Sequence, residues 1–371
     1  MGDAQERVRA LLDALVATGA EDGLQVAVYR YGELLVDAVA GVADPATGRP
    51  VTGDTLFWSA STGKAATSTV AHVLVERGVF GYDTPVAELW PEFAAQGKGT
   101  ATVRHVLTHS VGLPGLPADI TPERLCDWDG MCRLLAGARP WWTPGERVGY
   151  HAVTFGYLVG EIVRRATGRR ISQVLADEVA GPLGVADELY LGVPAAELPR
   201  VARLTDDPVG RAAFAALPAD FPLLRAAPPG VLPDAGYGNR TDVLTSDIPA
   251  GGTLTARGIA RMYAALLDEV DGVRLLSPQR LSTATTLATA GRVDELGTGP
   301  STWAMGYSVG RPGRAAPGEH PTVFGMVGMG GSAAWADRAT GISVAVTRNR
   351  FNPVDMTAVE RVWDLVRERY G

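Results

Sequence analysis

The chain contains few of the residues that build disulfide frameworks and metal sites. Among its 371 residues there are two cysteines and five histidines. Two thiols, Cys126 and Cys132 in a loop that contains tryptophan, are too few for a disulfide framework and are interpreted as incidental. His105 and His109 have the i,i+4 spacing of a helical ligand pair, but no third ligand lies nearby in the sequence. We therefore expect no metal and no other cofactor.

Long apolar runs and an excess of positive charge are also absent. Without a run of about 18 apolar residues, no transmembrane helix is expected. The formal net charge of −7 argues against nucleic acid or an anionic membrane as a partner. The opening residues, MGDAQERVRA, include acidic side chains and no apolar signal segment, which predicts a cytoplasmic location. The 46% of hydrophobic and 20% of charged residues are typical of a globular enzyme.

Both ends of the chain contain strand patterns next to an amphipathic helix. Apolar residues recur at helical spacing over 4–17, and residues 24–44 form two strands around a turn at Tyr31-Gly32. The other end has four short strands and then a helix, at 303–310, 322–327, 332–337, 341–349 and 356–370. We therefore predict one antiparallel sheet built from both termini and flanked by the terminal helices.

The middle of the chain is mainly helical. Helices are predicted over 61–78, 153–168 and 255–270, the last with Thr255 as N-cap. This gives an α/β sheet domain from residues 1–60 and 300–371, with a mainly helical domain of residues 61–299 inserted between them. Residues 196–250, rich in Ala, Pro and Gly, form either a loop-rich wall or lid over a site or an inert connection.

The first chemical motif is Ser61-Thr62-Gly63-Lys64. A serine and a lysine at i,i+3 lie on one helix face, one turn apart. The positive potential of a helix start and partial burial both favour the neutral amine, which can accept the serine proton. S-x-x-K is the nucleophile motif of β-lactamases and penicillin-binding proteins. Alone it is a weak signal, because an N-cap serine and a solvated lysine give the same pattern.

Three further blocks follow this motif in order. They are TVRHVLTHSVGLP (102–114), WWTPGERVGYHAVTFGYLVGEIVRRATG (141–168) and PAGGTLTARGIARMYAAL (249–266). With these blocks the chain resembles the class C-related branch of the serine β-lactamase-like superfamily, which includes family VIII carboxylesterases, D-amino-acid-releasing peptidases and acyltransferases of secondary metabolism. The resemblance implies a β-lactamase/transpeptidase-like fold, with the site between an α/β domain and an all-helical domain.

The family's second motif, Tyr-x-Asn, corresponds to Tyr150-His151-Ala152. The tyrosine, which serves as a base beside the lysine, is retained, and its phenolate would be stabilised by an ammonium. An aromatic plug before a helix is the alternative for Tyr150. Ala152 replaces the amide that holds the lysine and the substrate amide, which favours an esterase or acyltransferase over lactam hydrolysis. His151 is a candidate supporting residue at the substrate site.

The third motif, Lys-Thr-Gly or His-x-Gly, corresponds to Met326-Val327-Gly328. Met326 replaces the cation that binds a substrate carboxylate, so the substrate either lacks a carboxylate or uses another base. Candidates for that base are Arg314, His320 and Arg348, each of which is more often a surface charge. The resemblance implies backbone N–H groups of Ser61 and Met329 as oxyanion donors.

The remaining candidates have structural alternatives. The resemblance implies that His105 and His109 are structural, one capping a helix and one bonding the following loop. Trp141 and Trp142 precede the tyrosine loop and could line an acyl pocket, although core packing explains them equally well.

We therefore predict a serine hydrolase of small-molecule carboxylic esters that uses Ser61, Lys64 and Tyr150. The alternative is an acyltransferase that passes the acyl group from a small-molecule donor to an amine or alcohol. A β-lactamase or D-peptidase is less favoured. A catalytically silent binding module would be expected to lack one of the three residues.

Overall fold

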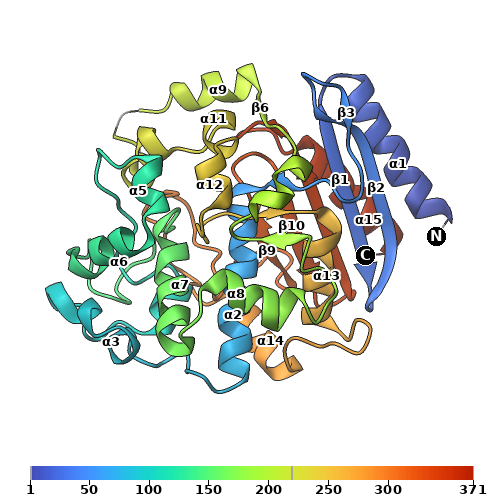
Figure 1. Ribbon diagram of the computed structural model, residues 1–371. Helices are drawn as coiled ribbons and strands as arrows, with labels where there is room; N and C mark the ends of the chain where they lie inside the picture. Colours follow the sequence, from blue (N-terminus) through green and yellow to red (C-terminus); the bar gives the residue numbers. More distant parts are fainter. Residues whose placement is uncertain (1, 219, 371) are drawn as a thin grey trace.

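Strands from both chain ends form one antiparallel sheet. The computed structural model describes residues 2–218 and 220–370 (Figure 1). Its seven-stranded sheet has the order β3-β2-β1-β11-β10-β9-β8. The strands are β1 Gly23–Arg30, β2 Glu33–Asp44, β3 Arg49–Pro50, β8 Ser308–Val309, β9 Val323–Val327, β10 Ala333–Asp337 and β11 Ile342–Arg348. Antiparallel pairing of β1 with β11 joins the two ends of the chain, so the predicted fold class is confirmed.

Helices cover both faces of the sheet (Figure 1). Alternate side chains of β1 and β11 pack with α1 Gly2–Ala17 and α15 Thr357–Tyr370 on the outer face. The side chains between them pack inward, where α13 Ala256–Leu267 lies against the sheet. The terminal helices therefore occur as predicted, and Thr255 caps α13 by accepting the N–H of Gly258 at 2.9 Å.

The turn between β1 and β2 also agrees with the sequence. Tyr31 and Gly32 both have positive φ, at 49° and 82°, as a two-residue type I′ hairpin turn requires. The predicted strand at 303–310 is shorter than expected, because only Ser308–Val309 is a strand. Residues before it turn at Gly306, whose φ is 81°, and the Gly306 carbonyl accepts the Ser68 hydroxyl at 3.0 Å.

The helical region surrounds a central helix, α2 Lys64–Glu76, whose residues are nearly all buried. Beside it lies α7 Thr154–Thr167, which ends at Gly168 in the left-handed conformation. The remaining helices here are α3 Val86–Leu89, η2 Pro91–Gly97, α4 Val103–Leu107, α5 Pro122–Cys126, α6 Trp128–Gly137, α8 Ile171–Leu175, η3 Ala176–Ala180 and α14 Pro278–Thr285. Cys126 and Cys132 thus lie in two short helices and not in a loop. The division of the chain at residues 61 and 299 stays a prediction.

The segment 196–250 is more ordered than its composition suggests. It contains η4 Ala195–Arg200, β6 Thr205–Asp206, α9 Pro208–Ala215, α10 Pro222–Ala226, η5 Pro229–Val231, α11 Ala235–Gly238 and α12 Thr241–Thr245. Helices of one or two turns are too short to show a periodic pattern. Asp207 and Asp234 cap α9 and α11, and β6 pairs with β12 Arg350–Phe351. Across the described residues, no helix is both long and apolar enough to cross a membrane.

Candidate active site

Ser61 lies in a tight turn between a small sheet and α2. The sheet consists of β4 Phe57–Trp58, β7 Thr253–Leu254 and β5 Leu189–Tyr190. After β4, the Ser59 N–H donates to Gly252 O at 2.8 Å, and Ala60 adopts a positive φ of 44°. The predicted helix then begins as a 3-10 turn, η1 Ala60–Gly63, before α2 starts at Lys64. This strained turn presents a half-buried Ser61 at the helix start.

The side chains of Lys64 and Tyr150 both contact the Ser61 hydroxyl. Lys64 Nζ and the Tyr150 hydroxyl each lie 2.8 Å from Ser61 Oγ. Lys64 Nζ also donates to the carbonyl of Ala250 at 2.6 Å and lies 5.3 Å from the centre of the Tyr150 ring. Residues 61, 64, 150 and 250 are thus brought together from three separate parts of the chain.

Burial has opposite effects on the charge of the two groups beside Ser61. Lys64 is 1% exposed, and burial lowers its pKa from 10.5 to about 7. The Tyr150 pKa is raised, mainly by burial and also by the negative charge of Asp294. At neutral pH the lysine is therefore readily deprotonated, whereas the tyrosine keeps its proton. The protonated Tyr150 differs from the phenolate expected from the sequence, because the buried Lys64 amine does not hold a full positive charge beside the ring.

Two residues that the motifs did not identify hold Tyr150 in place. Its ring stacks on Trp303 with the centroids 5.0 Å apart and the planes at 6°. Asp294 accepts both the Tyr150 backbone N–H, at 3.1 Å, and the Trp303 indole N–H, at 2.8 Å. A carboxylate thus joins the backbone of the tyrosine to the ring that supports it.

Three histidines, His105, His109 and His151, support the structure behind the site. The His105 ring accepts the Thr102 N–H at 3.2 Å and so caps α4, as expected. His109 Nδ1 accepts the His151 N–H at 3.2 Å. His151 is fully buried; its Nε2 accepts the Leu113 N–H at 3.0 Å and its Nδ1 donates to Gly149 O at 2.6 Å. The structure therefore does not bring His151 to the substrate pocket.

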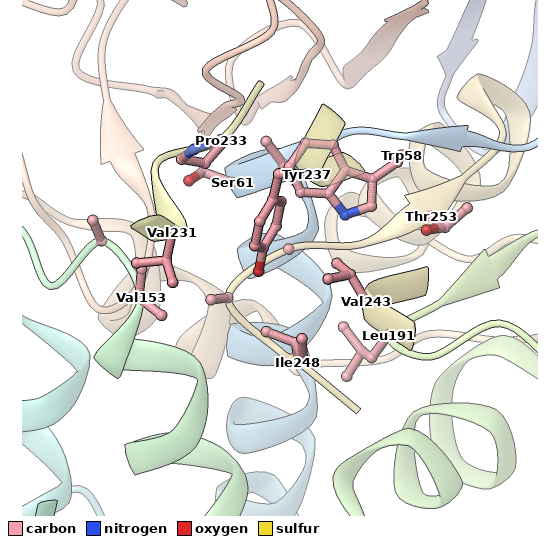
Figure 2. Close-up of a pocket in the computed structure, with 14 residues that line it drawn as sticks. Trp58, Ser61, Val153, Leu191, Val231, Pro233, Tyr237, Val243, Ile248 and Thr253 are labelled. Carbon is pink, nitrogen blue, oxygen red and sulfur yellow. The ribbon is translucent and has the colours of Figure 1, made fainter. Parts of the chain in front are cut away.

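A narrow pocket of about 40 Å³ opens beside Ser61 (Figure 2). It is lined by Trp58, Ala60, Ser61, Ala152, Val153, Leu191, Val231, Pro233, Tyr237, Val243, Ile248, Ala250, Gly251 and Thr253. Among the residues that the structure describes, no charged side chain belongs to this lining. Much of the wall comes from residues 231–251, so the end of the Ala-, Pro- and Gly-rich segment covers the serine.

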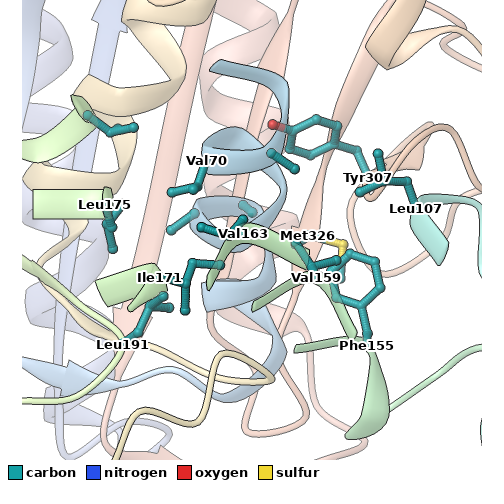
Figure 3. Packing of buried hydrophobic residues seen from close by; sticks show 14 of the residues in the cluster. Val70, Leu107, Phe155, Val159, Val163, Ile171, Leu175, Leu191, Tyr307 and Met326 are labelled. Carbon is teal, nitrogen blue, oxygen red and sulfur yellow. The ribbon is translucent and has the colours of Figure 1, made fainter. Parts of the chain in front are cut away.

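The third motif, residues 326–328, contributes to the site through its backbone and not through the side chain of Met326. Met326 is 3% exposed and lies in the core near Phe155 and Val159, away from the pocket (Figure 3). At Gly328 an added Cβ would lie 2.2 Å from Ser59 O, so glycine is needed where the end of β9 meets the serine turn. In the described part of the chain, neither the Ser61 nor the Met329 N–H donates to a backbone acceptor. Both donors are therefore free for a ligand.

The candidate substitutes for a substrate-binding cation all lie elsewhere. Arg348 is 2% exposed and donates to Glu21 at 2.5 Å and to Gly330 O at 2.9 Å. Arg314 pairs with Glu360 at 2.6 Å, and His320 contacts Arg367 of α15 at 2.7 Å. None of the three lines the pocket, so a substrate carboxylate would find no cation there.

The paired tryptophans also lie outside the pocket lining. The Trp142 indole donates to Ser110 O at 3.0 Å in the interior. Trp141 is 37% exposed and packs under Arg225, with 4.1 Å from the guanidinium carbon to the ring centre. Their role in the structure is therefore packing.

Comparison with known proteins places the chain among serine acyl enzymes. The family model described as Beta-lactamase matches residues 8–367. The chain is 37% identical over 352 residues to the esterase/β-lactamase LipL of Mycobacterium tuberculosis, covering 90% of this chain and 79% of that protein. It is 29% identical to the esterase EstB of Burkholderia gladioli, covering 92% and 90% of the two chains. The crystal structure of a family VIII carboxylesterase matches with a TM-score of 0.87 and 31% identity, over 99% of this chain and 98% of that one.

Proposed function

The chain belongs to the β-lactamase family, and we propose that it hydrolyses carboxylic esters of small molecules through an acyl-enzyme on Ser61. The observation on which this proposal rests is the position of Ser61 Oγ, 2.8 Å from both Lys64 Nζ and the Tyr150 hydroxyl. A serine hydroxyl between a readily deprotonated amine and a phenol has both a base and an acid within reach.

In the proposed reaction, neutral Lys64 accepts the proton as Ser61 Oγ attacks the ester carbonyl. The N–H groups of Ser61 and Met329 donate to the oxyanion that develops. Tyr150, protonated in the free enzyme, gives its proton to the departing alcohol and regains one from Lys64. Water then attacks the acyl-enzyme with the same two groups acting in reverse.

Esters are favoured over lactams for two reasons. Penicillin-type substrates contain a carboxylate, and the pocket beside Ser61 has no cation in its lining. Ala152 also provides no amide to bind the substrate's own amide. The similar protein EstB is named as an esterase, which supports the same choice, whereas LipL is named as both an esterase and a β-lactamase. We expect slow hydrolysis of nitrocefin, and efficient nitrocefin turnover would contradict this part of the proposal. A cytoplasmic location stays a prediction.

An acyltransferase is the second candidate. The observation that favours it is the apolar lining of the pocket, where Val153, Val231 and Ile248 surround the space next to the serine. These three side chains can hold an acyl chain, and on their side of the pocket they offer no hydrogen-bonding group to the hydrolytic water. An amine or alcohol could then reach the acyl carbon in place of water.

Intact-protein mass spectrometry with p-nitrophenyl butyrate tests both candidates. A butyryl adduct that decays in plain buffer supports the hydrolase. An adduct that persists until an amine is added makes the protein a transferase. Ser61→Ala should form no adduct and release no nitrophenol while it keeps the fold. If the wild-type protein forms no adduct and releases no nitrophenol, the protein is a silent binding module and the proposal fails.

A further inference from the structure

Two hydrogen-bond donors in the Ser61 pocket have no partner in the described parts of the chain, 2–218 and 220–370. The indole N–H groups of Trp128, Trp142 and Trp303 each donate to a protein oxygen. Trp58 Nε1 has no acceptor within the described residues, although the side chain is only 8% exposed. The hydroxyl of Tyr237 is likewise without a partner there, and both side chains line the pocket.

The two rings form one end of the pocket. Their centroids are 5.6 Å apart and their planes are inclined by 58°. Figure 2 shows the Tyr237 phenol extending between Val231 and Val243, with its hydroxyl directed toward Ile248. The Asp234 side chain accepts the Tyr237 backbone N–H at 2.7 Å and so caps α11. Trp58 is fixed by stacking on Phe351, with a centroid separation of 6.4 Å.

A ligand that displaces water from the pocket must replace the hydrogen bonds that these two donors can make to water. Buried indole and phenol groups normally find a hydrogen-bond partner, and a donor left unpaired in an apolar setting costs free energy. The pocket of about 40 Å³ has room for about three water molecules, which favours a short acyl chain.

We infer that the acyl group accepted by this enzyme is short and carries a neutral oxygen, such as an ether, hydroxyl or keto oxygen, that is bound by Trp58 Nε1 and the Tyr237 hydroxyl. This inference rests on the proposed function. The oxygen is neutral because the pocket lining contains no cation to offset the desolvation of a carboxylate. The Trp58 indole can only donate and the Tyr237 hydroxyl can donate alongside it, so an acyl chain that bonds to both presents an acceptor. A site built around such donors discriminates against an analogue that lacks the acceptor.

The test compares two esters of equal length. In p-nitrophenyl 3-methoxypropanoate one oxygen replaces a methylene of p-nitrophenyl pentanoate. The ratio of their kcat/KM values is divided by the ratio of their rates with hydroxide, which removes intrinsic reactivity. For the wild-type enzyme this corrected preference should be about fivefold or more in favour of the ether, as one hydrogen bond provides.

Tyr237→Phe should bring the corrected preference down by about fivefold. The variant should fold normally, because the hydroxyl has no protein partner to lose. Trp58→Phe should lower the preference as well. Val243→Ala is the matched control, since it enlarges the same pocket without removing a donor, and it should leave the preference unchanged.

Two outcomes would refute different parts of the argument. The wild-type enzyme could hydrolyse both esters with a corrected preference near one that does not change in Tyr237→Phe. This result overturns the inference that the acyl group carries a neutral oxygen and leaves the proposed esterase activity intact. Failure to hydrolyse either ester, with no acyl adduct on Ser61, overturns the proposed function itself.

Discussion

Replacing Lys64 with methionine should abolish activity and also stabilise the protein, most strongly at low pH. The wild-type lysine is buried, and its pKa falls from 10.5 in an unfolded chain to about 7 in the folded protein. Below pH 7 the folded state must either bury the charged amine or release its proton. This costs about 5 kcal/mol of stability relative to a residue that does not titrate.

The cost decreases as the pH rises. Between pH 7 and 10.5 the unfolded chain holds a proton that the folded protein does not, so wild-type stability increases with pH. About 2 kcal/mol of the cost remains at pH 9. The stability difference between Lys64→Met and wild type should therefore shrink by about 3 kcal/mol from pH 6 to pH 9. Loss of the hydrogen bond to Ala250 O costs about 1–3 kcal/mol, which still leaves the variant about 2 kcal/mol more stable at pH 6.

Urea unfolding followed by tryptophan fluorescence at pH 6, 7.5 and 9 would measure this difference. The hydrogen bonds that the methionine lacks cost the same at each pH, so they cancel in the comparison. Lys98→Met is a suitable control, because the buried Lys98 amine donates to the carbonyls of Ala95, Ala136 and Ala138 at 2.6–3.0 Å. Its loss should destabilise the protein and leave ester hydrolysis intact. An identical difference for Lys64→Met at all three pH values would refute the depressed lysine pKa.

Four further outcomes follow from the same geometry. The kcat/KM for p-nitrophenyl butyrate should rise about tenfold from pH 6 to pH 8, because Lys64 with a pKa of about 7 loses its proton in this range; a flat profile is incompatible with a lysine base. Tyr150→Phe should lower kcat by about a hundredfold or more with an unchanged unfolding midpoint, whereas full activity would leave Lys64 as the only proton carrier. Asp294→Asn removes a negative charge that raises the Tyr150 pKa, so the loss of activity at high pH should begin at a lower pH. If the high-pH side of the activity profile stays where it is, Asp294 does not control the Tyr150 pKa. Gly328→Ala should lower kcat because its Cβ would meet Ser59 O at 2.2 Å, while Gly137→Ala, with no atom within 4 Å of the added Cβ, should have no effect.

Local rules explain which parts of the fold could be predicted from sequence. Positive φ at Tyr31 and Gly32, the Thr255 cap and the apolar spacing of the terminal helices each depend on a few adjacent residues. The short helices within 196–250 could not be predicted, since a helix of one or two turns has no measurable period. The strand expected over 303–310 is shorter in the structure, because Trp303 stacks on Tyr150 and because the Met305 carbonyl and the Tyr307 hydroxyl bond to side chains of α2.

Sequence reasoning identified the site residues only where their side chains are chemically distinctive. Ser61, Lys64 and Tyr150 are reactive residue types at recognisable spacings, and the structure brings them together. The Ala250 carbonyl carries no such signal, because any residue type provides a backbone carbonyl. Asp294 acts through the backbone of Tyr150 and the indole of Trp303, which requires the tertiary structure to recognise. The sequence shows that Met326 stands where the family has a cation. It does not show that the Met326 side chain packs in the core.

The pocket lined largely by apolar side chains and the neutral form of Lys64 have one cause. Burial is the influence that lowers the lysine pKa, and the amine is bonded to an uncharged hydroxyl and an uncharged carbonyl. Ala152, at the position where the family has asparagine, adds a methyl group to the pocket lining and so keeps this region apolar. An acyl chain that fills the pocket excludes more water and favours the neutral amine further. Substrate binding should thus lower the lysine pKa, so the pH midpoint for kcat should lie below the midpoint for kcat/KM, and equal midpoints would show that the pocket and the lysine are independent.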